Sequence, residues 1–292
     1  MIPAPFEYHR PTSVADALSI CGRYGDEARV VAGGHSLIPM MKLRMAQPAH
    51  LVDLRDIAAL KGIREDVGID GGSIVIGAMT TQAEVIASPV LGRLCPILRE
   101  TALQIADPQI RNCGTLGGNV ANGDPGNDMP AVMQALDAVY IAEGPDGRIE
   151  LPARTFYEAA FFTTLPEGAI VTAIRIPTPR AGHGSAYVKQ KRKIGDYATA
   201  AAAVILSFEG GRCAHAAIAL TNVADTPLHA EEAAAALVGT ALDAAAVDRA
   251  VAAAEAITRP ASDGRGPAIF RTRVAGQMVR RAIAAAAERA RR

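Results

Sequence analysis

The chain is organised around the stretch Val30-Val31-Ala32-Gly33-Gly34-His35-Ser36-Leu37-Ile38-Pro39-Met40-Met41. Its two β-branched residues predict the end of a buried strand, and its paired glycines predict a tight turn. Leu37, Met40 and Met41 recur at the spacing of one helix face, so a short helix is expected after the turn. The stretch therefore predicts a strand, a glycine turn and a helix in succession.

Such a turn can serve as an anion cradle. Glycine has no Cβ and reaches positive φ, so a ligand can approach the backbone N–H groups of Gly33 and Gly34. N–H groups at the start of a helix also carry partial positive charge, which favours phosphate. We expect a side chain at either glycine to block the approach of phosphates. The alternative at this point is a tight connection that binds nothing.

The composition is that of a globular protein and argues against nucleic-acid binding. The chain has 292 residues, half of them hydrophobic, with 30 basic residues, 30 acidic residues and no tryptophan. This length suits two or three compact units. A nucleic-acid binder normally carries a basic surface, so a formal net charge of zero predicts no nucleic-acid partner. No stretch reads as a signal peptide or a transmembrane segment, and we expect a cytoplasmic protein.

The cysteines argue against a metal centre in this chain. Cys21, Cys95, Cys113 and Cys213 are far apart, and none belongs to a C-x-x-C pair. Zinc and iron–sulfur sites usually draw on closely spaced cysteines or on paired histidines. We therefore expect no metal ligands here, and any iron–sulfur chemistry must belong to another chain.

Patterns along the chain predict three units. Residues 1–55 read as a small α/β unit of helix, strand, glycine turn, helix and strand, which is short for a unit that folds alone. Residues 56–177 add a hairpin that turns at Gly71-Gly72, a helix that runs to about Ile105, and further strands. Prolines and glycines over 177–184 mark the next boundary.

The third unit, over 178–292, reads as α+β. Strands are expected over 184–190, 199–208 and 214–221, and alanine-rich helices over 230–237, 243–257 and 270–290. Strands followed by helices are typical of the α+β class.

A second glycine-rich stretch follows Asp107-Pro108 and runs Gln109-Ile110-Arg111-Asn112-Cys113-Gly114-Thr115-Leu116-Gly117-Gly118-Asn119-Val120-Ala121-Asn122-Gly123-Asp124. Few structural turns need so many small and hydrogen-bonding residues. The chain has neither a Rossmann G-x-G-x-x-G after a strand nor a P-loop. One mononucleotide phosphate requires only one glycine turn. A pyrophosphate that carries a group at each end would need contacts from two subdomains, and two glycine turns could provide them.

The two glycine stretches together resemble a known family. Ala32-Gly33-Gly34-His35-Ser36 and Thr115-Leu116-Gly117-Gly118-Asn119 are similar to the paired fingerprints of the FAD-binding medium subunits of molybdenum hydroxylases, the group that contains carbon monoxide dehydrogenase and bacterial xanthine dehydrogenase. The N-terminal segment over 3–11 and the segment over 193–198 also resemble this family. The resemblance implies a vanillyl-alcohol-oxidase-like (PCMH-type) FAD-binding fold of two subdomains, followed by a C-terminal α+β domain with an antiparallel sheet and helices.

The resemblance also implies a function. The chain would be an oxidoreductase subunit that holds FAD without a covalent bond. Substrate would be oxidised at the molybdenum cofactor of a large partner, and electrons would pass through the [2Fe-2S] clusters of a small partner to FAD, which would deliver them to a quinone, NAD or oxygen. The assembly would be a dimer of heterotrimers in the cytoplasm, with partners that could bring it to the inner face of the membrane.

The same resemblance implies the site residues. The pyrophosphate would be held by the backbone of two loops, which comprise Ala32, Gly33, Gly34, His35, Ser36 and Leu37 in one and Thr115, Gly117, Gly118 and Asn119 in the other. Asp128 would bind toward the adenosine or ribose, and Asp124 is included in the site. Lys189 and Tyr197 would lie near the isoalloxazine. No catalytic residue is assigned, because the flavin carries the chemistry.

Several of these residues have plainer interpretations. Asp128 could cap a helix, Lys189 could be a solvated strand residue, and Tyr197 could be a core aromatic. His35 is expected to shape its loop by a hydrogen bond rather than to bond covalently to the flavin. For the whole chain, the alternatives are a stand-alone flavin oxidoreductase of the same broad fold and a flavin-free scaffold subunit.

Overall fold

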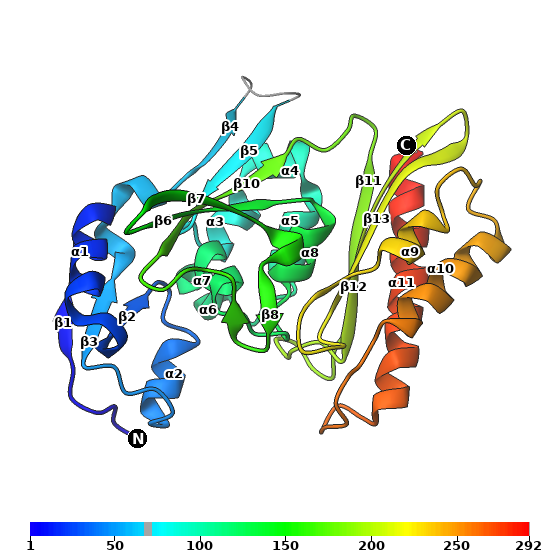
Figure 1. The fold of residues 1–292 in the computed structure, drawn as a ribbon. Helices are drawn as coiled ribbons and strands as arrows, with labels where there is room; N and C mark the ends of the chain where they lie inside the picture. Colours follow the sequence, from blue (N-terminus) through cyan, green and yellow to red (C-terminus); the bar gives the residue numbers. More distant parts are fainter. Residues whose placement is uncertain (67–71, 292) are drawn as a thin grey trace.

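The computed structural model describes residues 1–66 and 72–291. Three larger sheets lie in a row from the N-terminal part to the C-terminal part of the described chain, and a fourth sheet has only two strands (Figure 1). The predicted turn at Gly71-Gly72 falls partly on Gly71, which lies outside the described residues. Among the described residues, no helix combines the length and the hydropathy of a membrane span.

The N-terminal part is a parallel sheet in the order β1-β3-β2. Its elements are β1 (Glu7–His9), α1 (Val14–Tyr24), β2 (Ala28–Val31), α2 (Leu37–Lys42) and β3 (His50–Asp53), with 3₁₀ turns at Gly25–Glu27, Leu54–Asp56 and Ala58–Leu60. Helix α1 begins where the Ser13 side chain accepts a hydrogen bond from the backbone N–H of Asp16. The predicted strand, glycine turn and helix over 28–42 are confirmed.

The central part is an antiparallel sheet in the order β4-β5-β10-β6-β7. Its strands are β4 (Ile63–Asp66), β5 (Ser73–Gly77), β6 (Val139–Gly144), β7 (Gly147–Pro152) and β10 (Ile170–Pro177), with a small pair formed by β8 (Tyr157–Ala159) and β9 (Phe162–Thr163) and a 3₁₀ turn at Ala153–Thr155. Its helices are α3 (Gln82–Ala87), α4 (Pro89–Leu94), α5 (Pro96–Ala102), α6 (Pro108–Cys113), α7 (Leu116–Ala121) and α8 (Met129–Ala135).

The prediction of one helix up to about Ile105 is wrong. The segment forms three short helices, and two of them begin at a proline, Pro89 and Pro96. Proline lacks the N–H that would continue a helix and clashes with the preceding turn, but it fits the first helical position. The apolar residues therefore keep a helical spacing across the two points at which one helix ends and the next begins.

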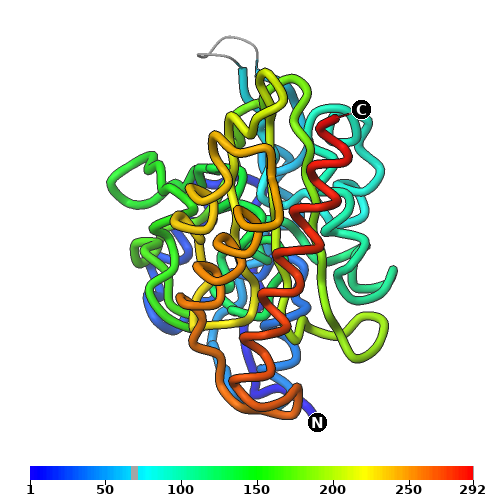
Figure 2. Tube along the Cα trace, turned by 90° about the vertical axis from the view of Figure 1, so that its right-hand side faces the viewer, coloured from blue at the N-terminus to red at the C-terminus, as the bar shows by residue number. Residues whose placement is uncertain are grey.

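The C-terminal part is an antiparallel sheet in the order β11-β12-β13-β14, covered by three helices. The elements are β11 (Gly184–Gln190), β12 (Ala200–Glu209), β13 (Arg212–Thr221), β14 (Leu228–His229), α9 (Glu231–Ala235), α10 (Ala244–Ala256) and α11 (Ala268–Ala290). Figure 2, in which this part faces the viewer, shows α11 crossing the outer face of the sheet. The predicted strands followed by helices are confirmed.

Strand β12 is buried on both faces. Alternate residues along a strand point to opposite faces of the sheet. Ala202 and Val204 belong to the core beneath the outer helices, whereas Ala201 and Ala203 belong to the core of the central part. One continuous core therefore joins the central and C-terminal parts, which explains the unbroken apolar run in this strand. The proposed unit boundaries at 55 and 177 stay a prediction, although each of the three sheets draws its strands from one predicted unit.

Candidate functional site

The first glycine turn leaves a row of backbone N–H groups without a partner. Gly34 has a positive φ of 73°, and its carbonyl accepts the first helical hydrogen bond from Ile38 at 2.9 Å. Within the described chain, the backbone N–H groups of the five residues from Gly33 to Leu37 donate no hydrogen bond. Buried or ligand-facing N–H groups in such a turn are suited to bind an anion.

His35 shapes this turn. Its Nδ1 lies 2.7 Å from the carbonyl oxygen of Gly33. Because a carbonyl only accepts, Nδ1 carries the proton and donates. The predicted loop-shaping hydrogen bond is confirmed.

Hydrogen bonds within the chain engage most of the amides of the second glycine stretch. It is largely helical, and the Thr115 side chain caps α7 by accepting from Gly118 N at 3.0 Å. Leu116 and Gly117 donate to Thr80 and Ala78 at 2.8 and 2.9 Å, and Asn119 donates to the Thr115 carbonyl at 3.0 Å. All four amides from 116 to 119 are therefore engaged within the chain. Of the amides from 115 to 119, only that of Thr115 donates no hydrogen bond among the described residues, and the pyrophosphate role of this loop stays a prediction.

Asn119 nevertheless has an unmatched polar atom. Its side-chain Oδ1 is buried and has no hydrogen-bond partner among the described residues. Its backbone carbonyl accepts from the side chain of Asn127 at 2.8 Å, which ties α7 to the loop that contains Asp124. A buried acceptor without a partner is uncommon and is suited to a ligand hydroxyl or amide.

The two glycine stretches touch each other. A Cβ added to Gly33 would lie 2.2 Å from the carbonyl oxygen of Cys113 and 2.7 Å from Gly114 Cα. A Cβ on Gly118 would lie 3.2 Å from the Cβ of Ala32. The missing side chain of Gly33 therefore makes room for the other loop, and its effect on the approach of phosphates stays a prediction.

Gly34 and Gly117 have other reasons to be glycine. A Cβ on Gly34 would meet the Ile38 side chain at 3.0 Å, at a φ that other residues rarely adopt. A Cβ on Gly117 would lie 2.5 Å from the Cβ of Ala78. These glycines also serve close packing within the protein.

A cavity of about 260 Å³ adjoins the first glycine turn. It lies where the parallel strands β2 and β3 end, the edge at which open α/β sheets place ligands. Asp53, at the end of β3, is buried and accepts from Tyr8 Oη and Arg55 Nε, both at 2.6 Å. The hydrogen bond to Asp53 raises the pKa of Tyr8. The lining residues are Phe6, Tyr8, Val31, Ala32, Gly33, Gly34, Ile38, Leu51, Asp53 and Arg55.

Sequence reasoning missed Tyr8, Asp53 and Arg55. The available signal was an acidic residue directly after a buried strand, at the same sheet edge as the glycine turn. The strand β1, which carries Tyr8, has only three residues and no readable alternation.

Asp128 lies in a buried polar cluster between the central and C-terminal parts. Lys189 Nζ donates to its Oδ2 at 2.7 Å, and Tyr187 Oη donates to its Oδ1 at 2.5 Å. Burial raises the pKa of Asp128, and the charge of Lys189 opposes that rise. Burial and the neighbouring carboxylate raise the pKa of Tyr187 well above its usual value.

The contacts in this cluster contradict the plainer interpretations of Asp128 and Lys189. Asp128 makes no side-chain capping bond to α8, and the Lys189 side chain is only 1% exposed. Asp128 therefore stands at the N-cap position of α8 without capping it through its side chain, and Lys189 is no solvated strand residue. Their predicted positions beside the adenosine and the isoalloxazine stay predictions.

Tyr197 and Asp124 meet at a second junction. Tyr197 Oη donates to Asp124 Oδ2 at 3.2 Å, and Asp124 Oδ1 accepts from Gly126 N at 2.8 Å. The side of the ring packs against Gly126, yet Tyr197 is 43% exposed, so the core-aromatic interpretation is wrong. Burial of part of the ring and the Asp124 charge raise the pKa of Tyr197 to about 12.

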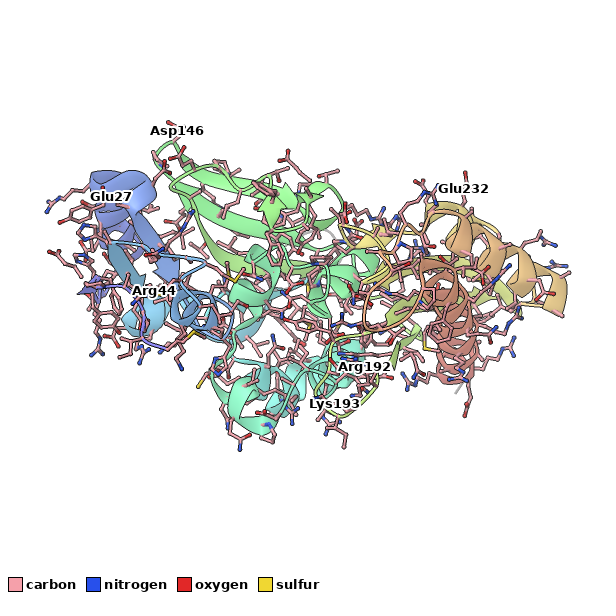
Figure 3. All side chains as sticks on the ribbon, turned by 90° about the horizontal axis from the view of Figure 1, so that it is seen from below. Glu27, Arg44, Asp146, Arg192, Lys193 and Glu232 are labelled. Atoms are coloured by element: carbon pink, nitrogen blue, oxygen red, sulfur yellow. The ribbon has the colours of Figure 1, made fainter. Side chains whose placement is uncertain are left out.

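The chain that carries Tyr197 lies against the central part. The segment between β11 and β12 contains Arg192 and Lys193, which Figure 3 shows beside the helices of that part. Lys191 Nζ donates to Gln104 Oε1 at 2.6 Å. The structure therefore brings the sequence-predicted residues together in three groups, namely the two glycine loops, the Asp128–Lys189 pair and the Asp124–Tyr197 pair.

Comparison with known proteins covers nearly the whole chain. The family described as "FAD binding domain in molybdopterin dehydrogenase" matches residues 4–179, and "CO dehydrogenase flavoprotein C-terminal domain" matches residues 185–286. The carbon monoxide dehydrogenase medium chain of Afipia carboxidovorans is 62% identical over 99% of both chains. That of Hydrogenophaga pseudoflava is 49% identical over 98% of both.

Solved structures agree with these matches. Reconstituted CO dehydrogenase from Oligotropha carboxidovorans superposes with a TM-score of 0.97 at 61% identity, over 99% of this chain and 100% of that chain. Quinoline 2-oxidoreductase from Pseudomonas putida 86 superposes with a TM-score of 0.93 at 33% identity, over 99% of both chains. The α+β class, the FAD-binding region followed by a C-terminal domain, and FAD as the cofactor are confirmed. The chain belongs to the family of FAD-binding medium subunits of molybdenum hydroxylases, and it is an oxidoreductase subunit.

Proposed function

We propose that this chain is the FAD-carrying electron-transfer subunit of a carbon monoxide dehydrogenase. The observation that carries the proposal is the row of unpaired N–H groups from Gly33 to Leu37, held against the second glycine stretch in a chain that resembles such medium chains over its full length. A relative at 62% identity favours carbon monoxide as the substrate of the complex.

The residues of the two loops fit FAD. Five free N–H donors in the first loop suit the negative charge of a pyrophosphate. The buried Oδ1 of Asn119 offers an acceptor to a hydroxyl or amide hydrogen. The proposed cofactor contacts are therefore Ala32, Gly33, Gly34, His35, Ser36, Leu37, Thr115, Gly117, Gly118, Asn119, Asp124, Asp128, Lys189 and Tyr197.

This chain contributes binding and orientation to the reaction. When bound, FAD supplies the chemistry of accepting electrons singly and giving them up in pairs. The raised pKa keeps Tyr197 protonated at neutral pH, so its hydroxyl donates a hydrogen bond to Asp124. His35 Nδ1 donates within its own loop, and the cofactor is held without a covalent bond in this proposal. We assign no general acid or base, because substrate oxidation belongs to a partner chain.

The partners follow from the same likeness. Relatives are named medium chains and subunits, and this supports a small iron–sulfur partner and a large molybdenum partner. We propose a dimer of heterotrimers in the cytoplasm, with a quinone, NAD or oxygen as the acceptor. The subunit names weigh against a stand-alone oxidoreductase, and the free N–H row weighs against a flavin-free scaffold.

Cofactor content and turnover test the proposal. The chain is purified alone and together with its two partners, and flavin is measured before and after acid precipitation. We expect about one FAD per chain that is released into the supernatant, and dye reduction by carbon monoxide only in the complex. A colourless complex would favour the scaffold. Turnover by the chain alone, or flavin that stays on the precipitate, would also contradict the proposal.

A further inference from the structure

Three metal-ligating side chains converge in the N-terminal sheet, away from the glycine loops in sequence. Glu7 and His9 are two residues apart on β1, so they lie on the same face of the sheet. The register of β1 with β3 pairs Glu7 with His50. Parallel strand pairing therefore places all three side chains on one face.

The distances between their polar atoms are short. His9 Nε2 lies 3.0 Å from His50 Nδ1, and His50 Nδ1 lies 3.4 Å from Glu7 Oε2. One ligand atom from each residue lies within 4.8 Å of the other two. The ring of His50 is buried and stacks on Tyr24 with centroids 3.6 Å apart, which fixes its orientation. Glu7 is exposed, so its carboxylate is free to adjust.

We infer that Glu7, His9 and His50 form a binding site for a divalent transition metal of the zinc class. Two imidazole nitrogens and one carboxylate oxygen are a ligand set that zinc takes, with a fourth position left for water. Zinc–nitrogen bonds of about 2.0–2.1 Å in tetrahedral geometry separate two nitrogens by roughly 3.3 Å. The two histidine nitrogens therefore need to move apart by only a few tenths of an ångström.

The same nitrogens can instead share a proton in an N–H···N hydrogen bond. Coordination requires the lone pairs of both nitrogens, so the shared proton moves to the other nitrogen of its own ring and both imidazoles stay neutral. His9 and His50 are 41 residues apart and are brought together by strand pairing. A search for closely spaced ligands could not find them, and the expectation of no metal ligands in this chain is one that this inference revises.

A metal here would tie two strands together. β1 is a three-residue strand at the edge of its sheet, and β3 lies in the middle. Binding to the folded state alone raises the melting temperature, because it adds RT ln(1 + [metal]/Kd) to the free energy of unfolding. The site would therefore hold the N-terminal strand in place beside the cavity at the first glycine turn.

Zinc titration of the full chain tests the inference. Calorimetry with zinc chloride is run on the Cys113→Ser protein, so that its exposed thiol does not bind the metal. In this background we compare Glu7→Gln and His9→Asn with a control, His183→Asn, whose Nδ1 bonds locally to the Arg180 carbonyl. We expect one site, weakened at least about tenfold by the first two changes and unchanged by the control. Magnesium chloride is expected to give no heat, because magnesium prefers oxygen ligands.

A second readout is the melting temperature with and without zinc. At one fixed zinc concentration it should rise in the parent protein and the control, and it should rise less in His9→Asn. Equal melting temperatures without metal, and equal FAD content, show that the variants fold. Absence of zinc binding to the parent, or equal binding by His9→Asn and His183→Asn, overturns the inference.

Discussion

A Cβ atom on Gly33 would lie 2.2 Å from the carbonyl oxygen of Cys113. Real Cβ atoms do not approach a backbone oxygen so closely, so only glycine permits this contact. The contact presses the turn with free N–H groups against the end of α6. Gly33 is therefore the residue at which the two glycine stretches, 80 residues apart, become one site.

Gly33→Ala should disturb this contact. The added methyl group meets backbone atoms that cannot give way cheaply, and overpacking of this kind costs about 1–3 kcal/mol. We expect a lower free energy of unfolding in urea and less bound FAD per chain.

Gly22→Ala is the matched control. Gly22 lies in α1, and its Cβ would meet nothing within 4 Å. Alanine has a higher helix propensity than glycine, so this change should raise the free energy of unfolding by about 0.5–1 kcal/mol. It should leave the FAD content unchanged. Full FAD content in Gly33→Ala would show that the loop contact is dispensable for binding.

Lys189→Met should destabilise the junction between the central and C-terminal parts. It leaves the buried Asp128 carboxylate without its cation, and breaking a buried pair in this way costs about 3–5 kcal/mol. Urea unfolding measures the loss. Asp128→Asn should recover part of it in the double variant, because the uncompensated charge is gone.

Arg10→Met provides the comparison for this pair. Arg10 pairs with Asp56 at the surface, where an ion pair contributes less than about 1 kcal/mol. If Lys189→Met cost no more than Arg10→Met, the buried pair would not hold the two parts together.

The stability contributed by Tyr197 should depend on alkaline pH. The pKa of Tyr197 is raised to about 12 from an ordinary value of 10.0. Between these values the folded chain keeps a proton that the unfolded chain loses, so this contribution is complete below about pH 10 and falls as the pH rises toward 12. The difference in stability between the parent and Tyr197→Phe should shrink over that window. A constant difference would mean that folding does not raise the pKa of this hydroxyl, either by burial or through Asp124.

Cys113 should be the thiol that reacts first. It is exposed, whereas Cys21, Cys95 and Cys213 are buried. Burial raises the pKa of Cys95 to about 12, which suppresses its reactive thiolate. Brief alkylation of the native chain should add one group, as read by peptide mass spectrometry, and Cys113→Ser should remain unmodified. Early modification of Cys95 would contradict the packing described here.

The first glycine loop and the C-terminal layer were predictable because their signals are local. Paired glycines after Val31 mark the turn, and the apolar run of β12 marks a strand. Neither of these local patterns reveals that the Cβ position of Gly33 faces Cys113, because that contact depends on how α6 packs. The same holds for the engaged amides of 116–119, whose acceptors Ala78 and Thr80 lie on another segment.

Other parts of the site depend on long-range pairing. Asp128 meets Lys189 across 61 residues, and the sequence alone could not separate a capping residue from half of a buried ion pair. Tyr8 and Asp53 meet only because β1 joins the edge of the parallel sheet. Three residues of strand carry too little pattern to predict that pairing.

Flavin reduction in the assembled complex shows directly whether this chain carries electrons from carbon monoxide. Carbon monoxide is added without oxygen to the purified complex that contains this chain, and visible flavin absorbance is followed. We predict that the flavin band bleaches and that admitting an acceptor restores it. A complex that oxidises carbon monoxide while its flavin band stays unchanged, or that contains no FAD, would show that this chain does not carry the electrons.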